Sequence, residues 1–149
     1  MTDYVSKVML RHLEQLKKEM KGYYAEDDIW IKTREIPNSA GNLCLHLCGN
    51  LQHYLGAVLG NTGYIRQRDE EFSAQDVPLE DLLNEIDQTS KVVKNTLQAL
   101  SATDLQANYP QEVFGSPMTT AYFLIHLTSH LGYHLGQINY HRRLLSVED

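Results

Sequence analysis

The sequence predicts an all-α fold, a single four-helix bundle that forms one domain over residues 1–149. Apolar residues recur at helical spacing in four long segments, and no alternating apolar and polar run is long enough for a strand. A length of 149 residues suits one domain, and no repeat, low-complexity tract or linker divides the chain. With only 9 Gly and 4 Pro, the composition argues against disorder.

The first two helices are predicted from apolar spacing and from signals at their ends. Lysines in the last turn and the following Gly22 end the first helix, residues 2–21. Residues 22–38 are expected to form a loop. Ser39 is a favourable N-cap for the second helix, which runs to Gly60. The apolar positions are Val5, Met9, Leu13, Leu16 and Met20 in the first helix and Leu43, Leu47, Leu51, Tyr54, Leu55 and Val58 in the second.

The last two helices each begin with a proline signal. Pro78 stands at the first position of the third helix, where a missing backbone N–H is tolerated, and the apolar pattern continues to Leu100. Ser116 and Pro117 form a cap and a helix-starting proline for the fourth helix, which runs to about Leu145. The connections expected to be irregular are residues 61–77 and 101–115.

Charge and cysteine content exclude several classes of protein. The formal net charge is −6, whereas a nucleic-acid-binding protein usually needs a basic face. No secretory signal is visible, and no stretch approaches the ~18 apolar residues of a membrane span. Cys44 and Cys48, four residues apart, are expected to be small core residues and form no disulfide framework. We therefore expect a cytoplasmic protein that binds neither nucleic acid nor membrane.

Four of the seven histidines line one edge of the last predicted helix. At about 100° per residue, His126, His130 and His134 lie within ~80° of one another, beside an apolar face of leucines, and His141 and Gln137 fall within that arc. Histidines four residues apart on a helix can ligate one ion in common. His126 and His134 are separated by ~12 Å of helical rise, so at most two of the three should bind a single ion.

The second predicted helix carries a matching polar stripe of His46, Asn50 and His53. If the two helices pack together, these stripes meet, and His46 is then the leading candidate for a third ligand. Three protein ligands leave a coordination position open for water or substrate. The spacing alone leaves a second interpretation, in which the histidines are hydrogen-bonded or surface residues.

Three segments together resemble the DinB/YfiT-like superfamily, and an uncharacterised branch of it most closely. These segments are Asn42-Leu43-Cys44-Leu45-His46-Leu47-Cys48-Gly49-Asn50-Leu51, Arg66-Gln67-Arg68-Asp69-Glu70-Glu71-Phe72, and His130-x-x-x-His134-x-Gly136-Gln137-Ile138. The likeness covers nearly the whole chain, and the combination of the three is more specific than any one of them.

The resemblance implies an up-down-down-up four-helix bundle, commonly a homodimer, with a divalent zinc or nickel ion. The ligands implied are His46 from the second helix and His130 and His134 from the last. This set satisfies the limit that helical rise imposes, since His126 is left out. Characterised relatives include thiol transferases that use bacillithiol and a mycothiol-dependent isomerase, so a low-molecular-weight thiol is an expected cosubstrate.

Four further residues are candidates for orienting the ligands or lining a substrate pocket. Asn50 and Gln137 lie about one turn from ligands, where each can orient an imidazole. His53 and His126 are candidate pocket residues. The segment 66–72 is interpreted either as a cap over the pocket mouth or as a charged surface loop.

Small residues on another face of the last helix allow a second helix to approach closely. Ser129, Gly132 and Gly136 fall together there. The approaching helix belongs either to a dimer partner or to an internal crossing, and the spacing does not separate these alternatives.

Three functions fit these residues, all with a small-molecule substrate or ligand. The first is thiol transfer to a small electrophile, because a metal with an open position favours the reactive thiolate. The second is a hydrolase that uses a metal-activated water, and the third is a non-enzymatic metal-dependent binder or sensor. No general base is assigned.

Overall fold

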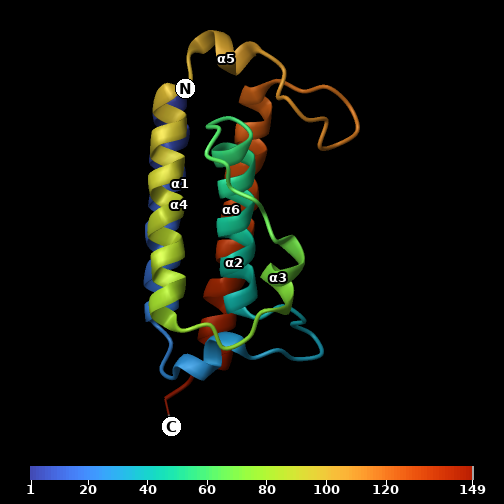
Figure 1. Cartoon of the computed structure of the whole chain (residues 1–149). Coiled ribbons are helices and arrows are strands. Elements are labelled where there is room, and N and C mark those ends of the chain that lie inside the picture. Colours follow the sequence, from blue (N-terminus) through green and yellow to red (C-terminus); the bar gives the residue numbers. More distant parts are fainter. Residues whose placement is uncertain (149) are drawn as a thin grey trace.

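The computed structural model describes residues 1–148, and these residues confirm the predicted all-α fold (Figure 1). They form no strand, although Asn108 and Thr119 pair in an isolated bridge. The four long helices are α1 (Thr2–Lys21), α2 (Ala40–Leu51), α4 (Leu79–Ala99) and α6 (Thr120–Leu145).

Short helical elements occupy all three connections, so the expectation of irregular loops there is wrong in part. A 3₁₀ turn, η1 (Glu26–Trp30), lies between α1 and α2, and its Glu26 carboxylate accepts a hydrogen bond from the first backbone N–H of α4. Helix α3 (Arg68–Ser73) opens with acidic side chains, which suit a helix N-terminus. Helix α5 (Ala102–Gln106) is held by a capping box in which Ser101 and Asp104 bond each other's backbone N–H.

Helix ends agree with the predicted signals at some points and differ at others. Ser39 is the N-cap of α2, as expected, and accepts a hydrogen bond from the N–H of Asn42. Helix α6 begins at Thr120 rather than at Ser116. The Thr119 side chain provides the cap, and the segment before it is tied to residues 107–109 by backbone hydrogen bonds, which prevents an earlier start.

The second helix changes character where a single helix was expected to continue to Gly60. Regular α-helix ends at Leu51, and residues Gln52–Ala57 form a π-helical turn, η2. The wider turn is marked by the hydrogen bond from the N–H of Val58 to the carbonyl of His53. Such π-turns occur frequently at functional sites.

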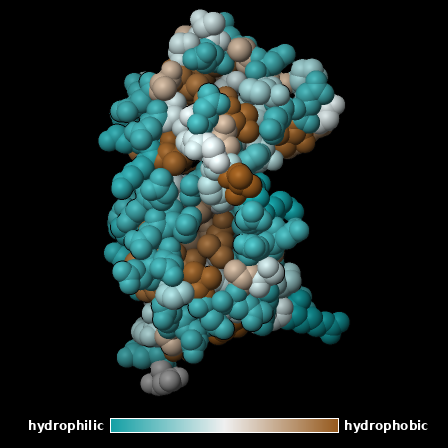
Figure 2. All heavy atoms as spheres, viewed as in Figure 1, coloured by the Kyte–Doolittle hydropathy of each residue, from teal (hydrophilic) through white to brown (hydrophobic). Residues whose placement is uncertain are grey.

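The long helices pack in pairs around one apolar core. Helix α1 contacts α4 and α6, and α2 contacts the same two helices. Figure 1 shows that α2 and α4 begin near the end of the molecule at which α1 and α6 finish. On the face seen in Figure 2, hydrophilic residues dominate, and hydrophobic ones gather in a furrow over α2, between α4 and α3. The large side chains that are fully buried include Met9, Leu13, Leu16, Met20, Leu47, Leu51, Leu55, Leu82, Ile86, Leu97 and Phe123.

Buried polar contacts fasten α1 and its following loop to the end of α6. The carboxylate of Glu19 accepts hydrogen bonds from Arg142 and Asn139, at 2.6 and 2.7 Å. Burial alone would raise the pKa of Glu19, but these bonds lower it overall, so the side chain stays charged. His141, 2% exposed, is bridged between the Tyr23 hydroxyl and the carbonyl of Ile31 and has a structural role.

The small residues of α6 separate into two environments. A Cβ added to Gly132 would lie 3.4 Å from the ring of His12 in α1, so this glycine lies at an internal helix crossing. A Cβ added to Gly136 would meet no atom within 4 Å. Gly136 therefore faces open space. Among the described residues, no helix combines the length and apolarity needed to cross a membrane.

Candidate metal centre

Three histidines from two helices converge at one point. His46 comes from α2, and His130 and His134 come from successive turns of α6. One ligand atom from each lies within 4.8 Å of the others. The Nε2 atoms of His46 and His130 are 3.2 Å apart, and the ring of His134 lies 4.6 Å from that of His130. The structure thus brings together the three residues that the resemblance implied.

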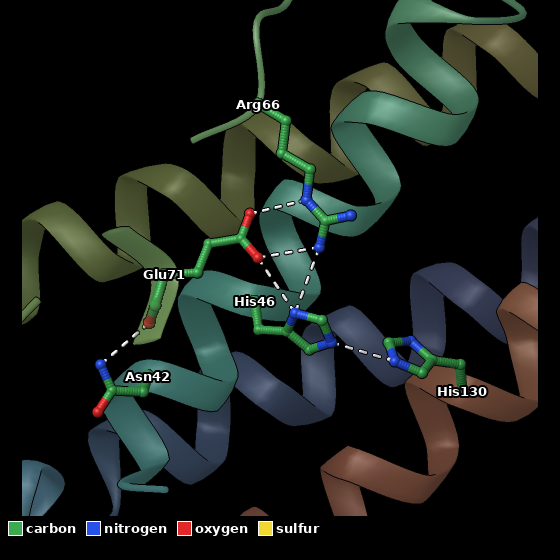
Figure 3. A network of polar contacts seen from close by, with 5 residues as sticks. All are labelled: Asn42, His46, Arg66, Glu71 and His130. Atoms are coloured by element: carbon green, nitrogen blue, oxygen red, sulfur yellow. Dashed lines mark hydrogen bonds and ion pairs between the residues drawn. The ribbon is translucent and has the colours of Figure 1, made fainter. Parts of the chain in front are cut away.

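A buried ion pair orients the ring of His46 (Figure 3). Nδ1 of His46 lies 3.1 Å from Oε1 of Glu71 and 3.3 Å from Nη2 of Arg66. A carboxylate only accepts and a guanidinium only donates, so Nδ1 cannot bond both, and the shorter contact assigns Nδ1–H as the donor to Glu71. Arg66 donates two hydrogen bonds to the same carboxylate, each 2.9 Å long. This arrangement leaves the lone pair on Nε2 of His46 directed toward His130.

Helix α3 is anchored so that Glu71 reaches this position. The side-chain amide of Asn42 in α2 donates to the backbone carbonyls of Glu71 and Ala74, at 3.0 and 2.8 Å (Figure 3). The Phe72 ring then covers His46, with a centroid distance of 4.9 Å. Segment 66–72 therefore contributes to the site, rather than forming only a charged surface loop.

Gln137 fixes the second imidazole. Nδ1 of His134 lies 2.7 Å from Oε1 of Gln137, which can only accept, so Nδ1 carries the proton and Nε2 keeps its lone pair. Hydrogen bonds from the non-ligating nitrogen to a fixed acceptor are typical of metal-binding histidines. The expected orienting role of Gln137 is compatible with this contact.

The electrostatics keep His130 and His134 neutral. Burial lowers the pKa of His130 to about 4, and a proton there would also be disfavoured by the neighbouring imidazoles of His134 and His46. Burial also lowers the pKa of His134, despite the opposing hydrogen bond to Gln137. For Glu71, burial would raise the pKa, but the bonds from His46 and Arg66 lower it overall. Neutral imidazoles backed by an ionised carboxylate are the protonation states that a metal site needs.

The separation of the nitrogens fits a tetrahedral metal ion. Two Zn–N bonds of ~2.0–2.1 Å at a tetrahedral angle place their nitrogens about 3.3 Å apart. The two Nε2 atoms of His46 and His130 are 3.2 Å apart. Within the described part of the chain, the cluster contains these two residues and His134 and no fourth ligand. The residues present therefore fit a divalent ion, to which three protein ligands would leave a fourth position open.

The cluster lies in the wall of a cavity of about 380 Å³ between α2, α3 and α6. Two buried polar atoms of this wall, Oδ1 of Asn50 and Nδ1 of His130, have no hydrogen-bond partner within the described residues. The lining residues are Asn38, His46, Asn50, Tyr54, Arg66, Arg68, Phe72, Val113, Phe123, His126, His130 and His134.

Of the remaining candidate residues, His126 and Asn50 line the cavity and His53 does not. His126 lines the cavity and stacks with Phe123, one turn before His130. Asn50 lines the cavity but makes no hydrogen bond to the three histidines. His53 is not among the lining residues and packs edge-on against Tyr54, and burial lowers its pKa.

Two residues of this site were not recognised from the sequence. Glu71 follows His46 by 25 positions, and only the packing of α3 on α2 brings them together. Gly49 makes room for Glu71, since a Cβ there would lie 1.9 Å from Oε2. The signal that could have indicated Gly49 is a glycine inside a buried helix, where it normally lowers stability.

Comparison with known proteins places the chain in a family without giving it a function. No curated protein and no solved structure matches the chain. Residues 2–149 match the family DUF1572, which is described as a protein of unknown function. Because the match covers nearly the whole chain, the protein belongs to the DUF1572 family.

Proposed function

We propose that this protein is a divalent-metal-dependent enzyme of the DinB/YfiT-like type that transfers a low-molecular-weight thiol to a small electrophile. The observation that carries the proposal is the cluster of His46, His130 and His134 in the wall of a cavity. The directions of α1, α2, α4 and α6 in Figure 1 support an up-down-down-up bundle.

The three histidines would hold zinc or nickel, and Glu71 and Gln137 would keep two of the rings in place. When bound, the ion would supply a Lewis-acid position that favours the thiolate form of a thiol. The aromatic side chains around the site, including Phe72 and Phe123, would exclude water from the reacting groups.

Hydrolysis is the second candidate, and the composition of the cavity limits its choice of general base. A hydrolase usually needs a general base beside the attacking water, most often His and otherwise Asp or Glu. His126 is the histidine of the lining that lies outside the ligand set. No carboxylate lines this cavity among the described residues, and Glu71 lies behind His46 with both oxygens bonded. In thiol transfer, the proton of the incoming thiol would pass to His126 or to water, so the resemblance to thiol transferases, rather than the lining, favours that reaction.

The reaction can be tested with purified protein and a chromogenic electrophile of the chlorodinitrobenzene type. We expect conjugation to a low-molecular-weight thiol such as cysteine only when zinc or nickel is also present, and no conjugation by the His134→Ala variant. Absorbance of the conjugate gives the rate. Turnover of ester substrates without added thiol would instead indicate a hydrolase, and the absence of both activities would leave a binder or sensor.

We further propose that the protein is a homodimer that associates through the outer face of α6. Five large apolar side chains lie there within an arc of about 100°, over ~33 Å of helix. Gly136, in the same arc, leaves open space for a close approach. Contact of this stripe with its own copy would give a two-fold interface. The five are Tyr122, Ile125, Tyr133, Tyr140 and Leu144, each 57–66% exposed.

A charge within this stripe is expected to separate the dimer. Sedimentation should give twice the chain mass of 17.1 kDa for the unaltered protein and the single mass for Ile125→Glu. Ile65, 77% exposed and outside the stripe, gives the matched control Ile65→Glu, which should remain dimeric. A monomeric unaltered protein at micromolar concentration would rule the interface out.

A further inference from the structure

We propose that the cavity beside the three histidines takes an organic carboxylate, whose charged group is bound by Arg68. The inference rests on the proposed function in treating this cavity as the substrate pocket. It adds a substrate class, which neither the metal cluster nor the family establishes.

The charge of the cavity wall is opposite to that of the protein. The chain carries 19 acidic and 13 basic residues, yet among the described residues the only formally charged side chains that line this cavity are Arg66 and Arg68. A divalent ion on the neutral imidazoles would add further positive charge. A positively charged cavity in a negatively charged protein attracts anionic ligands and raises their local concentration.

The two arginines differ in their availability. The Nε and Nη2 groups of Arg66 donate hydrogen bonds to the Glu71 carboxylate. The Arg66 side chain is 11% exposed. Arg68 is exposed, and its guanidinium forms no hydrogen bond or ion pair with any described residue. It lies over the ring of Phe72, 5.4 Å from the centroid. Arg68 is therefore held at the cavity with its donors free.

A free guanidinium is well suited to a carboxylate. Its planar fork of N–H groups matches the two oxygens of a carboxylate and binds them through paired, charge-assisted hydrogen bonds. The contact with the Phe72 ring uses none of the N–H groups of Arg68, so they are available for a carboxylate.

The other residues that line the cavity indicate the chemical character of the rest of the ligand. Tyr54, Phe72, Val113 and Phe123 provide apolar and aromatic surface, while Oδ1 of Asn50 is a free acceptor. The volume of about 380 Å³ lies within the range of small-molecule sites. The ligand is thus a compact molecule with an apolar body and one carboxylate.

Binding of phenylacetate and of its neutral analogue phenylacetamide tests the proposal. Titration calorimetry at constant ionic strength should show that zinc-loaded protein binds the anion about tenfold more tightly than the amide. Arg68→Gln should weaken phenylacetate binding by about tenfold and leave phenylacetamide binding within about twofold. Arg11→Gln removes an equal charge from an exposed position on α1. It should change the affinity for neither phenylacetate nor phenylacetamide.

The outcomes separate this proposal from the proposed function. Equal binding of the two probes, no binding of phenylacetate at millimolar concentration, or full anion binding by Arg68→Gln would each overturn it. If the protein fails to take up zinc or to transfer a thiol, the proposed function fails. The dependence of phenylacetate binding on Arg68 in metal-free protein would still support the carboxylate site.

Discussion

Replacing His46 by alanine is expected to abolish stoichiometric metal binding. His46 is the one ligand from α2, and without it only His130 and His134 remain, both on α6. Loss of groups that merely orient a ligand weakens metal affinity ~10–100-fold, so loss of a ligand should exceed about 100-fold. Elemental analysis should find one zinc or nickel ion per unaltered chain and almost none in His46→Ala.

A thermal measurement gives an independent readout of the same site. A ligand at ~100 times its dissociation constant stabilises the folded state by about 2.7 kcal/mol, so added zinc should raise the melting temperature of the unaltered protein. The shift should disappear in His46→Ala. His126→Ala is the matched control, because His126 lies one turn from His130 but outside the cluster, and it should keep both the ion and the shift.

Either of two results would contradict the proposed metal centre. One is unaltered protein that is free of zinc and nickel after expression with both metals supplied. The other is equal metal content in the unaltered protein and in His46→Ala. Loss of metal in His126→Ala would contradict the ligand set, since helical rise separates His126 from His134 by ~12 Å.

Local sequence signals predicted the long helices and the shared face of the histidines in the last one, because both depend on spacing along one helix. Helical geometry limits a single ion to two of His126, His130 and His134, and the resemblance to the DinB/YfiT-like superfamily implied which two. The cap at Ser39 is likewise local, because its partner is the N–H of Asn42, three residues on.

The remaining features depend on contacts between distant segments. Glu71 and His46 meet only because Asn42 anchors the end of α3. The start of α6 was misplaced because Ser116 and Pro117 are a valid local signal that is overridden by backbone pairing with residues 107–109. Gly136 and Gly132 are equivalent in sequence spacing, and only the position of α1 distinguishes them.

Gly49→Ala, at a buried position of α2, is expected to displace Glu71 from the metal site. The added Cβ would lie 1.9 Å from Oε2 of Glu71, so the carboxylate must move and leave its partners Arg66 and His46. Removing one partner of a buried ion pair costs ~3–5 kcal/mol. Urea denaturation should show a loss of this order, and metal affinity should fall about 10–100-fold as His46 loses its orienting bond.

Gly132→Ala is the matched control for the general effect of alanine in a helix. Its Cβ would approach no atom closer than 3.4 Å, at the flexible end of the His12 side chain. Because alanine is favoured over glycine inside helices by up to ~1 kcal/mol, this variant should be as stable as the unaltered protein or more stable. A comparable loss of stability in both variants would show that the effect of Gly49→Ala is not specific to Glu71.

A double-mutant cycle isolates the contact between Gly49 and Glu71. Glu71→Ala removes the carboxylate that the new Cβ would strike, so Gly49→Ala should cost little when it is added to Glu71→Ala. The two single losses would then fail to add, as is expected of residues in direct contact. Additive losses would mean that Gly49 affects the fold independently of Glu71. A non-additive result would establish that a glycine in α2 is required for the carboxylate that orients His46.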